Sequence, residues 1–507
     1  MKVPLTVLDH IDRAELVYGA RIGVIDEPDQ PATSWGTLTY ARMAELARAQ
    51  AAGLDALGIG VGERVAVVSH NSARLLTAFF GVSGSGRIVV PVNFRLSPAE
   101  IAYIVEHCGA SMLLVDPELD EALAGIGPAH RYVLGAESDA ALYRFGVEPV
   151  PWAGIDEDAT AAINYTSGTT ARPKGVQLTH RNIWVNAATF GWHLGVDDRD
   201  VYLHTLPMFH CNGWGMPYAV TAMGGRHVVL RKVDGAEILR RVDAHGVTVL
   251  CGAPAVAAAV LDAAALWDGP VPGRGRVRMV VAGAPPPTRI IERVRAELGW
   301  EFVQIYGLSE TSPLLTMSRE REEWDACTPE ETARNLSRAG APALGVRVRI
   351  SPEGEVQARG NVVFDGYWEQ HDATAEAIPD GWLRTGDGGH LDGAYVVIAD
   401  RKKDVIISGG ENVSSIEVED ALFSHPAVAE AAVIGVPSEK WGETVKALVV
   451  LAPGAEATEA EIIEHCRSLL AHYKCPTSVD FRAELARTAT GKLQKFKLRA
   501  PYWEGRE

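Results

Sequence analysis

The sequence predicts an α/β protein in which a large N-terminal domain precedes a smaller C-terminal one. Two stretches, residues 1–150 and 200–300, alternate short apolar runs with segments of helical periodicity, which is typical of parallel sheets covered by helices. From Arg347 onward, short alternating strands between Gly and Asp turns indicate a small β-rich layer. We therefore expect one domain of βαβ sheets plus this layer over residues 1–402.

The first stretch shows the alternation most clearly. Its expected strands are Val65–Val68, Ile88–Val92 and Met112–Asp116, and its expected helices are Leu38–Leu57, Ser72–Phe80 and Pro98–Cys108. The second stretch repeats the order, with expected strands at Val201–Leu206, His227–Leu230, Val247–Cys251 and Val277–Ala282. The helices between them are expected at Trp214–Met223, at Ala236–Ala244 and in the alanine-rich run that follows.

The pattern changes again after Asp400–Asp404, a short run of charged residues. Helices are expected at Ser415–Phe423 and Glu459–Ala471, strands at Val428–Gly435 and Val445–Val450, and a basic tail ends the chain. We place the domain boundary at this charged run, so that a compact α+β domain occupies residues 403–507.

The overall composition restricts the classes of partner. The chain has 507 residues, 47% of them hydrophobic, which is enough for roughly two to four domains. Its formal charge of −17 argues against nucleic acid or an anionic membrane as a partner, because either would require a basic surface. The six cysteines show no metal-ligand spacing and indicate reduced thiols. Without a signal peptide or an apolar run long enough to span a membrane, a cytoplasmic protein is expected.

The most specific motif is Tyr165–Gly175, Tyr-Thr-Ser-Gly-Thr-Thr-Ala-Arg-Pro-Lys-Gly. Apolar runs at Ala161–Ile163 and Val176–Leu178 flank it, so two strands are expected to meet in this loop. Hydroxyls and backbone N–H groups around Gly168 can surround phosphate oxygens, and Lys174 adds a mobile cation. A Walker-type loop is excluded, because it needs a second glycine before the lysine and Ser or Thr after it. The expected phosphate contacts are Thr166, Ser167, Gly168, Thr169, Thr170 and Lys174.

A second motif, Gln304–Thr311, follows an apolar strand, and open α/β sheets bind ligands in loops after the carboxyl ends of strands. Its candidate contacts are Gln304 for an exocyclic amine, Tyr306 beside Gly307 for the face of a base, and Ser309 for an α-phosphate. Glu310 provides the hard oxygen ligand that Mg²⁺ prefers. An ordinary Ser/Glu helix cap is the alternative interpretation.

Both motifs resemble those of the adenylate-forming superfamily, which contains acyl-CoA synthetases, luciferases and the adenylation domains of peptide synthetases. The first is similar to its triphosphate-binding signature. The segment Tyr306–Glu310 is similar to its Tyr-Gly-x-Thr-Glu motif, with Ser309 in place of threonine. The resemblance extends over nearly the whole chain, is closest to acyl-CoA synthetases, and implies ATP, Mg²⁺ and coenzyme A as cofactor and co-substrate.

The resemblance assigns further nucleotide contacts. The run Gly283-Ala284-Pro285 looks like the turn that contacts adenine, where small residues let a flat ring approach the backbone. Asp387 matches the carboxylate that takes both ribose hydroxyls, helped by an arginine that matches Arg401. Plain turn chemistry could also explain Asp387, but the Asp400-Arg401 pair that follows favours the functional interpretation.

The segment Leu206–Trp214, Leu-Pro-Met-Phe-His-Cys-Asn-Gly-Trp, resembles the motif that lines the acyl pocket of the family. His210 would be the aromatic gate between the carboxylate and the nucleotide, although a single histidine is more often structural. Zinc binding is not expected, because no Cys or His stands at ligand spacing beside His210. The expected pocket residues are His210, Trp214, Gly252, Ala253, Ala282 and Gly283.

Three C-terminal positions also match the family. Lys492 occupies the place of the catalytic lysine, where a cation on a loop can stabilise developing charge, and a solvated basic tail is the alternative. Ser408, Gly409 and Gly410 match the turn that lines the CoA tunnel after domain rotation. Lys403 falls at the hinge, so the resemblance implies that the C-terminal domain is a mobile lid.

The implied activity is that of an acyl-CoA synthetase. ATP and a hydrophobic carboxylic acid would give an acyl-adenylate, and the CoA thiol would then give a thioester, with Lys492, His210, Glu310 and Lys174 as the catalytic residues and Glu310 as the metal ligand. The alternatives are delivery to a carrier-protein thiol, an enzyme specialised in the second half-reaction, and a nucleotide-binding pseudoenzyme. A homodimer is compatible with the sequence.

Three departures from the family pattern affect the ATP-dependent step. Ala171 stands where glycine is usual, Ser309 replaces threonine, and Ala486 replaces a proline before Arg487. Glycine reaches positive φ and lets the backbone lie against phosphate, whereas alanine there costs roughly 1 kcal/mol. The sequence therefore leaves open weak adenylation beside efficient thioester formation, with a separate enzyme supplying the acyl-adenylate.

Overall fold

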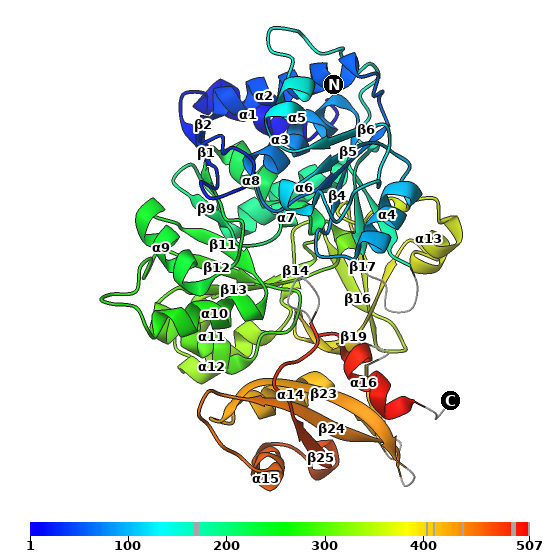
Figure 1. The fold of residues 1–507 in the computed structure, drawn as a ribbon. Coiled ribbons are helices and arrows are strands. Elements are labelled where there is room, and N and C mark those ends of the chain that lie inside the picture. The colour runs from blue at the N-terminus through cyan, green and yellow to red at the C-terminus, as the bar shows by residue number, and fades with distance from the viewer. Residues whose placement is uncertain (167–171, 402–403, 409–410, 439–440, 488–492, 505–507) are drawn as a thin grey trace.

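The computed structural model describes the chain except for residues 167–171, 402–403, 409–410, 439–440, 488–492 and 505–507, and of Arg401 it describes the backbone alone (Figure 1). The α/β fold and its division into a large N-terminal and a small C-terminal domain are confirmed. We call the described residues up to Arg401 the N-terminal body and those from Asp404 onward the C-terminal unit. Among the described residues, no helix combines the length and the apolar character that crossing a bilayer requires.

The first sheet carries the predicted alternation of residues 1–150 and the predicted loop. Its strands, in spatial order, are β18 (Gly366–Tyr367), β8 (Lys174–Thr179), β7 (Thr160–Thr166), β4 (Ile88–Val92), β3 (Arg64–Val68), β5 (Ala110–Val115) and β6 (His130–Val133). Its helices are α2 (Tyr40–Ala56), α3 (Ala73–Gly81), α4 (Pro98–His107), α5 (Ala136–Leu142) and α6 (His180–Leu194). The pairs among β4, β3, β5 and β6 are parallel, and β4, β3 and β5 have the largely apolar sequences expected of strands covered on both faces.

The second sheet follows the pattern of residues 200–300 and adds strands that the sequence did not indicate. Its order is β15 (Ala341–Pro342), β14 (Thr316–Ser318), β13 (Glu301–Tyr306), β12 (Arg278–Val281), β11 (Val249–Gly252), β9 (Val201–His204), β10 (Arg226–Val229), β1 (Ile22–Ile25) and β2 (Thr37–Thr39). Its helices are α1 (Leu8–Tyr18), α7 (Cys211–Trp214), α8 (Met216–Met223), α9 (Gly235–His245), α10 (Pro254–Ala264), α11 (Thr288–Arg293) and α12 (Pro329–Ser337). The early strand β1 therefore joins the later sheet, where it pairs in parallel with β10.

The predicted β-rich layer is a third sheet in the order β16 (Arg347–Ile350), β17 (Glu355–Arg359), β19 (Leu383–Asp392) and β20 (Tyr395–Arg401), with α13 (His371–Ala377) before β19. Its antiparallel pairs match the short alternating runs of the sequence. In Figure 1 this layer lies between the two larger sheets and the C-terminal unit.

The C-terminal unit has a sheet and a core of its own. Strands β22 (Glu411–Val413), β21 (Ile406–Ser408), β24 (Gly442–Leu451) and β23 (Val428–Ser438) lie side by side, and β25 (Ser478–Phe481) pairs with β24. Helices α14 (Ser415–Phe423) and α15 (Glu459–Leu469) cover a core that includes Val433 and Ile462. The predicted domain boundary at residues 402–403 lies outside the described residues and stays a prediction.

The interpretation of the C-terminus as a basic tail is wrong. Residues Lys495–Trp503 form helix α16, which packs against β23 through Leu498 and Tyr502. Lys495 is buried in an ion pair with Glu419, 2.8 Å away, and also donates to Ser415 Oγ. The sequence pattern suggested a solvated tail because Lys495 was considered without its acidic partner on α14.

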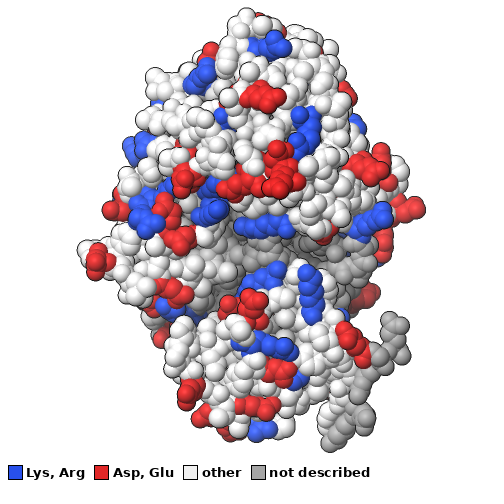
Figure 2. Space-filling model, viewed as in Figure 1, with Lys and Arg blue, Asp and Glu red and all other residues white. Residues whose placement is uncertain are grey.

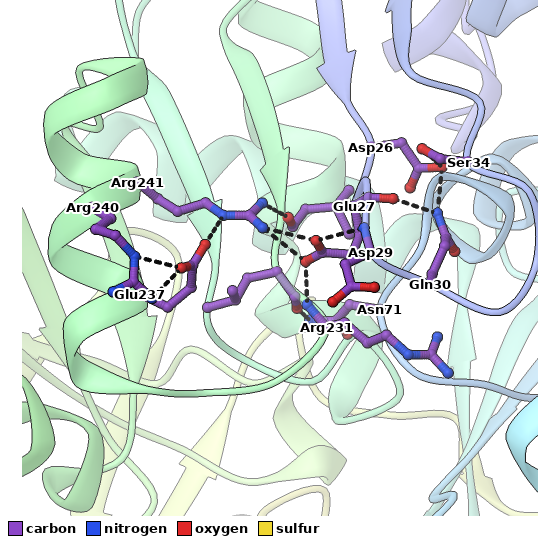
Figure 3. Close-up of polar contacts among 12 residues, drawn as sticks. Asp26, Glu27, Asp29, Gln30, Ser34, Asn71, Arg231, Glu237, Arg240 and Arg241 are labelled. Carbon is purple, nitrogen blue, oxygen red and sulfur yellow. Dashed lines mark hydrogen bonds and ion pairs between the residues drawn. The ribbon is translucent and has the colours of Figure 1, made fainter.

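A buried ion network, made of Glu27, Asp116, Arg231 and Arg241, lies where the two large sheets meet, and Figure 3 shows its part around Glu27 and Arg241. Arg241 on α9 binds both oxygens of Glu27, at 2.8 and 3.0 Å, within the second sheet. Arg231 after β10 binds both oxygens of Asp116 after β5, and this pair joins the two sheets. Burial alone would raise the pKa of Asp116, but the hydrogen bonds and charge of Arg231 outweigh it and lower that pKa. The Asp116 carboxylate therefore stays ionised and paired inside the protein.

The N-terminal body contacts the C-terminal unit through buried hydrogen bonds from Ser415 to Asp400 and through partly exposed hydrogen bonds between α11 and α14. At the start of α11, the backbone N–H of Thr288 donates to Asp420 on α14 at 3.0 Å. In return, Arg289 donates to the carbonyl oxygens of Phe423 and His425 at the end of α14, at 3.3 and 3.1 Å. Each helix terminus thus has its unpaired backbone groups satisfied by a side chain of the other helix.

Candidate functional site

Most of the predicted site residues meet at one edge of the second sheet. Strands β9, β11, β12 and β13 are parallel neighbours, so their carboxyl ends open on the same side. The segments that follow these ends are Leu206–Trp214, Gly252–Ala253, Ala282–Pro285 and Tyr306–Glu310. Figure 2 shows a hollow between the N-terminal body and the C-terminal unit, with Lys and Arg side chains on both of its rims. Basic groups around a hollow in an acidic protein are suited to an anionic ligand.

The predicted hairpin is confirmed on both sides of its loop. Strands β7 and β8 are antiparallel, and Thr166 lies opposite Lys174 at their open ends. Lys174 Nζ lies 4.7 Å from the centre of the Tyr367 ring. Ser167, Gly168, Thr169, Thr170 and Ala171 lie outside the described residues, so their phosphate contacts stay predictions.

The loop after β13 has room for glycine alone at one position. A Cβ atom on Gly307 would lie 1.5 Å from the carbonyl oxygen of Pro313, which also accepts a hydrogen bond from Thr311 Oγ1 at 2.7 Å. The tight loop continues into a single 3-10 turn at Ser309–Thr311. It therefore presents Ser309 and Glu310 together at the sheet edge.

The Glu310 carboxylate accepts a hydrogen bond that the sequence did not reveal. The Tyr367 hydroxyl donates to Glu310 Oε1 at 2.8 Å. Tyr367 lies on β18, which pairs with β8, so it sits between the predicted metal ligand and Lys174. A two-residue strand gives no periodic signal, and the Gly-Tyr-Trp run at 366–368 is the feature that could have marked it.

Asp387 is buried and engaged on two sides. Its Oδ2 accepts a hydrogen bond of 2.8 Å from the Tyr306 hydroxyl, and β19 places it opposite Arg401 on β20. The sheet register therefore brings together the two residues predicted to bind ribose, with Tyr306 beside them. The contact of each with a nucleotide stays a prediction.

Gln304 is held at the end of β13. Its side chain is buried, and its amide, with the nitrogen oriented toward α12, donates to the carbonyl oxygens of Leu336 and Ser337 at 2.9 and 3.1 Å. The amide nitrogen is therefore used within the protein, whereas an exocyclic amine would need the amide oxygen, and that contact stays a prediction. The adenine turn Gly283–Pro285 is largely exposed at the sheet edge, open to a ring.

The predicted acyl segment has an unusual backbone. Cys211, Asn212 and Trp214 all have positive φ, at 47°, 49° and 60°, and the Trp214 side chain is 3% exposed. Asn164 on β7 donates to the Phe209 carbonyl at 3.3 Å and to Asn212 at 3.2 Å, which joins the acyl segment to the phosphate hairpin. Burial raises the pKa of Cys211, so its thiol stays protonated.

A buried asparagine, which the sequence did not single out, holds the start of this segment. Asn71 donates to the carbonyl oxygens of His204, Leu206 and Leu230, and it accepts from the Met208 N–H at 2.7 Å. Both the nitrogen and the oxygen of its amide are therefore bonded to the main chain. His210, half-buried two residues further on, takes its position from this anchored stretch.

The small pocket residues border this segment. Gly252 and Ala282 are buried at the ends of β11 and β12, and Thr205 Oγ1 bonds the Cys251 carbonyl at 2.6 Å. Of the C-terminal positions, Ser408 ends β21, whereas Gly409, Gly410, Lys403 and Lys492 lie outside the described residues. Their roles in the CoA tunnel, the hinge and catalysis stay predictions.

Comparisons with known proteins agree with this site. The family model of the AMP-binding enzyme matches residues 21–368, and that of the AMP-binding enzyme C-terminal domain matches residues 417–492. A 2-methylpropanoate–CoA ligase of Humulus lupulus is 38% identical, over 98% of this chain and 95% of the relative. A 4-hydroxybutyrate–CoA ligase of Metallosphaera sedula is 37% identical, over 91% and 89%.

Solved structures show the same architecture. The o-succinylbenzoate CoA synthetase of Bacillus subtilis, in complex with its acyl-adenylate intermediate, has a TM-score of 0.82 at 28% identity, with 97% of each chain covered. An anthranilate CoA ligase in complex with anthranoyl-AMP has a TM-score of 0.87 at 26% identity, with 99% of each chain covered. The protein therefore belongs to the AMP-binding enzyme family and is an adenylate-forming acyl-CoA synthetase.

Proposed function

We propose that the protein uses ATP and Mg²⁺ to activate a short aliphatic carboxylic acid and then transfers the acyl group to coenzyme A. The observation that carries this proposal is a pair of tyrosine–carboxylate contacts at one sheet edge. Tyr306 binds Asp387, the predicted ribose ligand, and Tyr367 binds Glu310, the predicted metal ligand. Tyr306 and Glu310 belong to one tight loop. The contact at Asp387 would therefore suit the ribose of a nucleotide, and the contact at Glu310 would suit the metal and phosphates of the same nucleotide.

The chemistry needs no covalent enzyme nucleophile. A carboxylate oxygen attacks the α-phosphorus in line, the bond to the bridging oxygen breaks, and pyrophosphate leaves with the electron pair. Lys174 and Lys492 would stabilise the charge on the phosphates, since positioning and electrostatics dominate such transfers. The CoA thiol, having lost its proton, then attacks the acyl carbonyl, and AMP leaves.

Glu310 fits a Mg²⁺ ion that is shared with phosphates. Within the described residues there is no cluster of three or more His, Cys, Asp or Glu side chains that could hold a metal. Mg²⁺ commonly takes one or two carboxylates, several waters and substrate phosphates, so a single glutamate beside a phosphate loop is sufficient. When bound, the ion would neutralise charge on the leaving pyrophosphate.

Two observations support a short acid. Trp214 is buried in the segment expected to line the acyl pocket, where a large ring leaves little depth for a long chain. Relatives that align over nearly the whole chain are named for short acids, such as the 2-methylpropanoate and 4-hydroxybutyrate ligases above and a butyrate–CoA ligase of Arabidopsis thaliana.

The test is pyrophosphate release with ATP, Mg²⁺ and a series of acids from acetate to octanoate, followed by thioester formation with CoA. We expect both steps, with the best activity at acids of about the size of butyrate. A best activity with octanoate would contradict the size argument. Thioester formation with a carrier-protein thiol but not with CoA would contradict the proposed acceptor.

The two half-reactions can be separated with Lys492→Ala. This lysine's predicted partners are ATP and the carboxylate, so the variant should lose pyrophosphate release but keep thioester formation from a supplied acyl-adenylate. Equal loss of both would contradict its predicted role.

The departure at Ala171 has its own test. Brisk and equal pyrophosphate release by the wild type and Ala171→Gly would exclude the alternative of a thioester-forming enzyme supplied by a partner. A clear gain in the glycine variant would favour that alternative.

A further inference from the structure

Tyr367 contacts both charged side chains that a phosphate–metal site needs. Its hydroxyl lies 2.8 Å from Glu310 Oε1, and its ring centre lies 4.7 Å from Lys174 Nζ. Building on the function proposed above, we propose that Tyr367 is a positioning residue for ATP and Mg²⁺. Its hydroxyl sets the direction of the Glu310 carboxylate, and its ring holds the Lys174 ammonium next to it.

The backbone around Tyr367 is fastened to the phosphate hairpin. Strand β18 pairs with β8, with Tyr367 opposite Val176, and the Trp368 N–H donates to the Gly175 carbonyl at 2.7 Å. The Tyr367 N–H donates to Thr374 Oγ1 at 2.9 Å. Movement of β8, which begins at Lys174, is therefore coupled to Tyr367.

The same short segment also holds the main chain of Glu310. The Phe364 N–H donates to the Glu310 carbonyl at 2.9 Å, and the Phe364 ring packs edge-on against Tyr367 with centroids 4.8 Å apart. Glu310 is thus held at its backbone by Phe364 and at its side chain by Tyr367. Two contacts from one segment leave the carboxylate little freedom to turn.

The direction of the Tyr367 hydrogen bond suits this role, because its hydroxyl lies 2.8 Å from one oxygen of Glu310. A hydrogen bond to one carboxylate oxygen leaves the other oxygen pointing in a set direction. Because Mg²⁺ demands near-octahedral geometry, a carboxylate that is already oriented binds it at lower entropic cost.

Two substitutions separate the hydroxyl from the ring. Titration calorimetry measures ATP binding with EDTA and with MgCl₂, and the ratio of the two affinities is the gain from Mg²⁺. In Tyr367→Phe this gain should fall about tenfold, the usual size of one hydrogen bond to a charged group, while binding without Mg²⁺ stays within about twofold. Tyr367→Leu also loses the ring, so its binding without Mg²⁺ should weaken about threefold.

Tyr502→Phe is the matched control. Its hydroxyl also donates to a carboxylate, Asp480, but in the C-terminal unit on α16. This variant should bind ATP like the wild type in both conditions. A thermal melt of each variant shows whether it is folded.

If Mg²⁺ strengthens ATP binding to Tyr367→Phe as much as it strengthens ATP binding to the wild type, the proposal is overturned. An equal weakening with and without Mg²⁺ would overturn it too, since it would mean that Tyr367 supports the fold alone. If the wild type binds ATP but releases no pyrophosphate with any acid, the proposed function fails while the Mg²⁺ gain still decides the role of Tyr367. If the wild type binds no ATP, both fail.

Discussion

The two joints of the molecule are built differently. The joint between the large sheets is closed by a buried ion pair, in which the side chains of Arg231 and Asp116 are 5% and 3% exposed. The joint between the N-terminal body and the C-terminal unit combines half-buried hydrogen bonds from Thr288 and Arg289 with buried hydrogen bonds from Ser415 to Asp400, next to the predicted hinge. Breaking a buried ion pair costs about 3–5 kcal/mol, whereas a partly exposed hydrogen bond contributes about 0.5–1.5 kcal/mol.

The difference indicates which parts are expected to move. A site that serves two half-reactions needs one surface that keeps its shape and another that can be exchanged. The edge that carries Tyr306 and Glu310 is part of the second sheet, which the buried Arg231–Asp116 pair fixes to the first sheet. The weak, reciprocal helix caps at the other joint are compatible with release, and we propose that the C-terminal unit turns there as a lid.

The largest expected effect is a loss of stability of the N-terminal body in acid, because this body buries several histidines in their uncharged form. Burial lowers the pKa of His10 and His180 to about 4 and that of His227 to about 3. The unfolded chain binds these protons near pH 6.5, so stability is complete above that pH and falls as the pH drops toward 4. Each histidine should remove about 2 kcal/mol by pH 5.

Denaturant unfolding at pH 7.5 and pH 5 measures this loss. His10→Gln removes one of the titrating groups, so the stability of this variant should depend less steeply on pH. Equal free energies of unfolding for the wild type at the two pH values would contradict the expectation.

The next effect comes from two neighbouring arginines on α9. Arg241→Met leaves the Glu27 carboxylate without its ion-pair partner inside the protein, which should cost about 3–5 kcal/mol in the free energy of unfolding. Arg240→Met removes an exposed pair with Glu237 and should cost less than about 1 kcal/mol. Denaturation curves of both variants check the contrast, and equal midpoints would mean that the buried ion pair stabilises the protein no more than the exposed one.

The smallest effect on stability is expected at the joint with the C-terminal unit. Arg289→Ala and Asp420→Ala should each cost less than about 1.5 kcal/mol. Because they remove contacts of one domain orientation, they should change the rates of adenylation and thioester formation in opposite directions, by about threefold. Arg293→Ala, on the same helix but paired with Glu297, is the control and should change neither rate. A parallel change of both rates would argue against the lid.

The sequence predicted those parts of the fold that depend on local pattern. Strand β3 and helix α3 follow from periodicity, and the β7–β8 hairpin follows from two apolar runs around a polar loop. Strand β1 was missed because its partner β10 lies some two hundred residues later in the chain. Helix α16 was missed because its stability depends on Lys495 reaching Glu419.

The predictions for the candidate site divide in the same way, between local motifs and contacts of residues far apart in the sequence. Motifs such as Tyr306–Glu310 could be identified because each lies within one loop. Tyr367 is 57 residues from Glu310, and the bond between them exists only because β18 pairs with β8. Gln304 was assigned to a base from its position, but the packing of α12 provides partners for its amide that no local pattern indicates.

The left-handed backbone at Cys211–Trp214 restricts which residues can replace Trp214, the predicted wall of the acyl pocket. A β-branched residue at Trp214, where φ is 60°, would add strain to a conformation that already disfavours side chains. Valine or isoleucine is therefore a poor route to a deeper pocket, and glycine or asparagine remains as the replacement with the least backbone cost. Selection for larger acids, in nature or in a laboratory library, should therefore favour these two residues at Trp214, because Ala253 and Ala282 are already small.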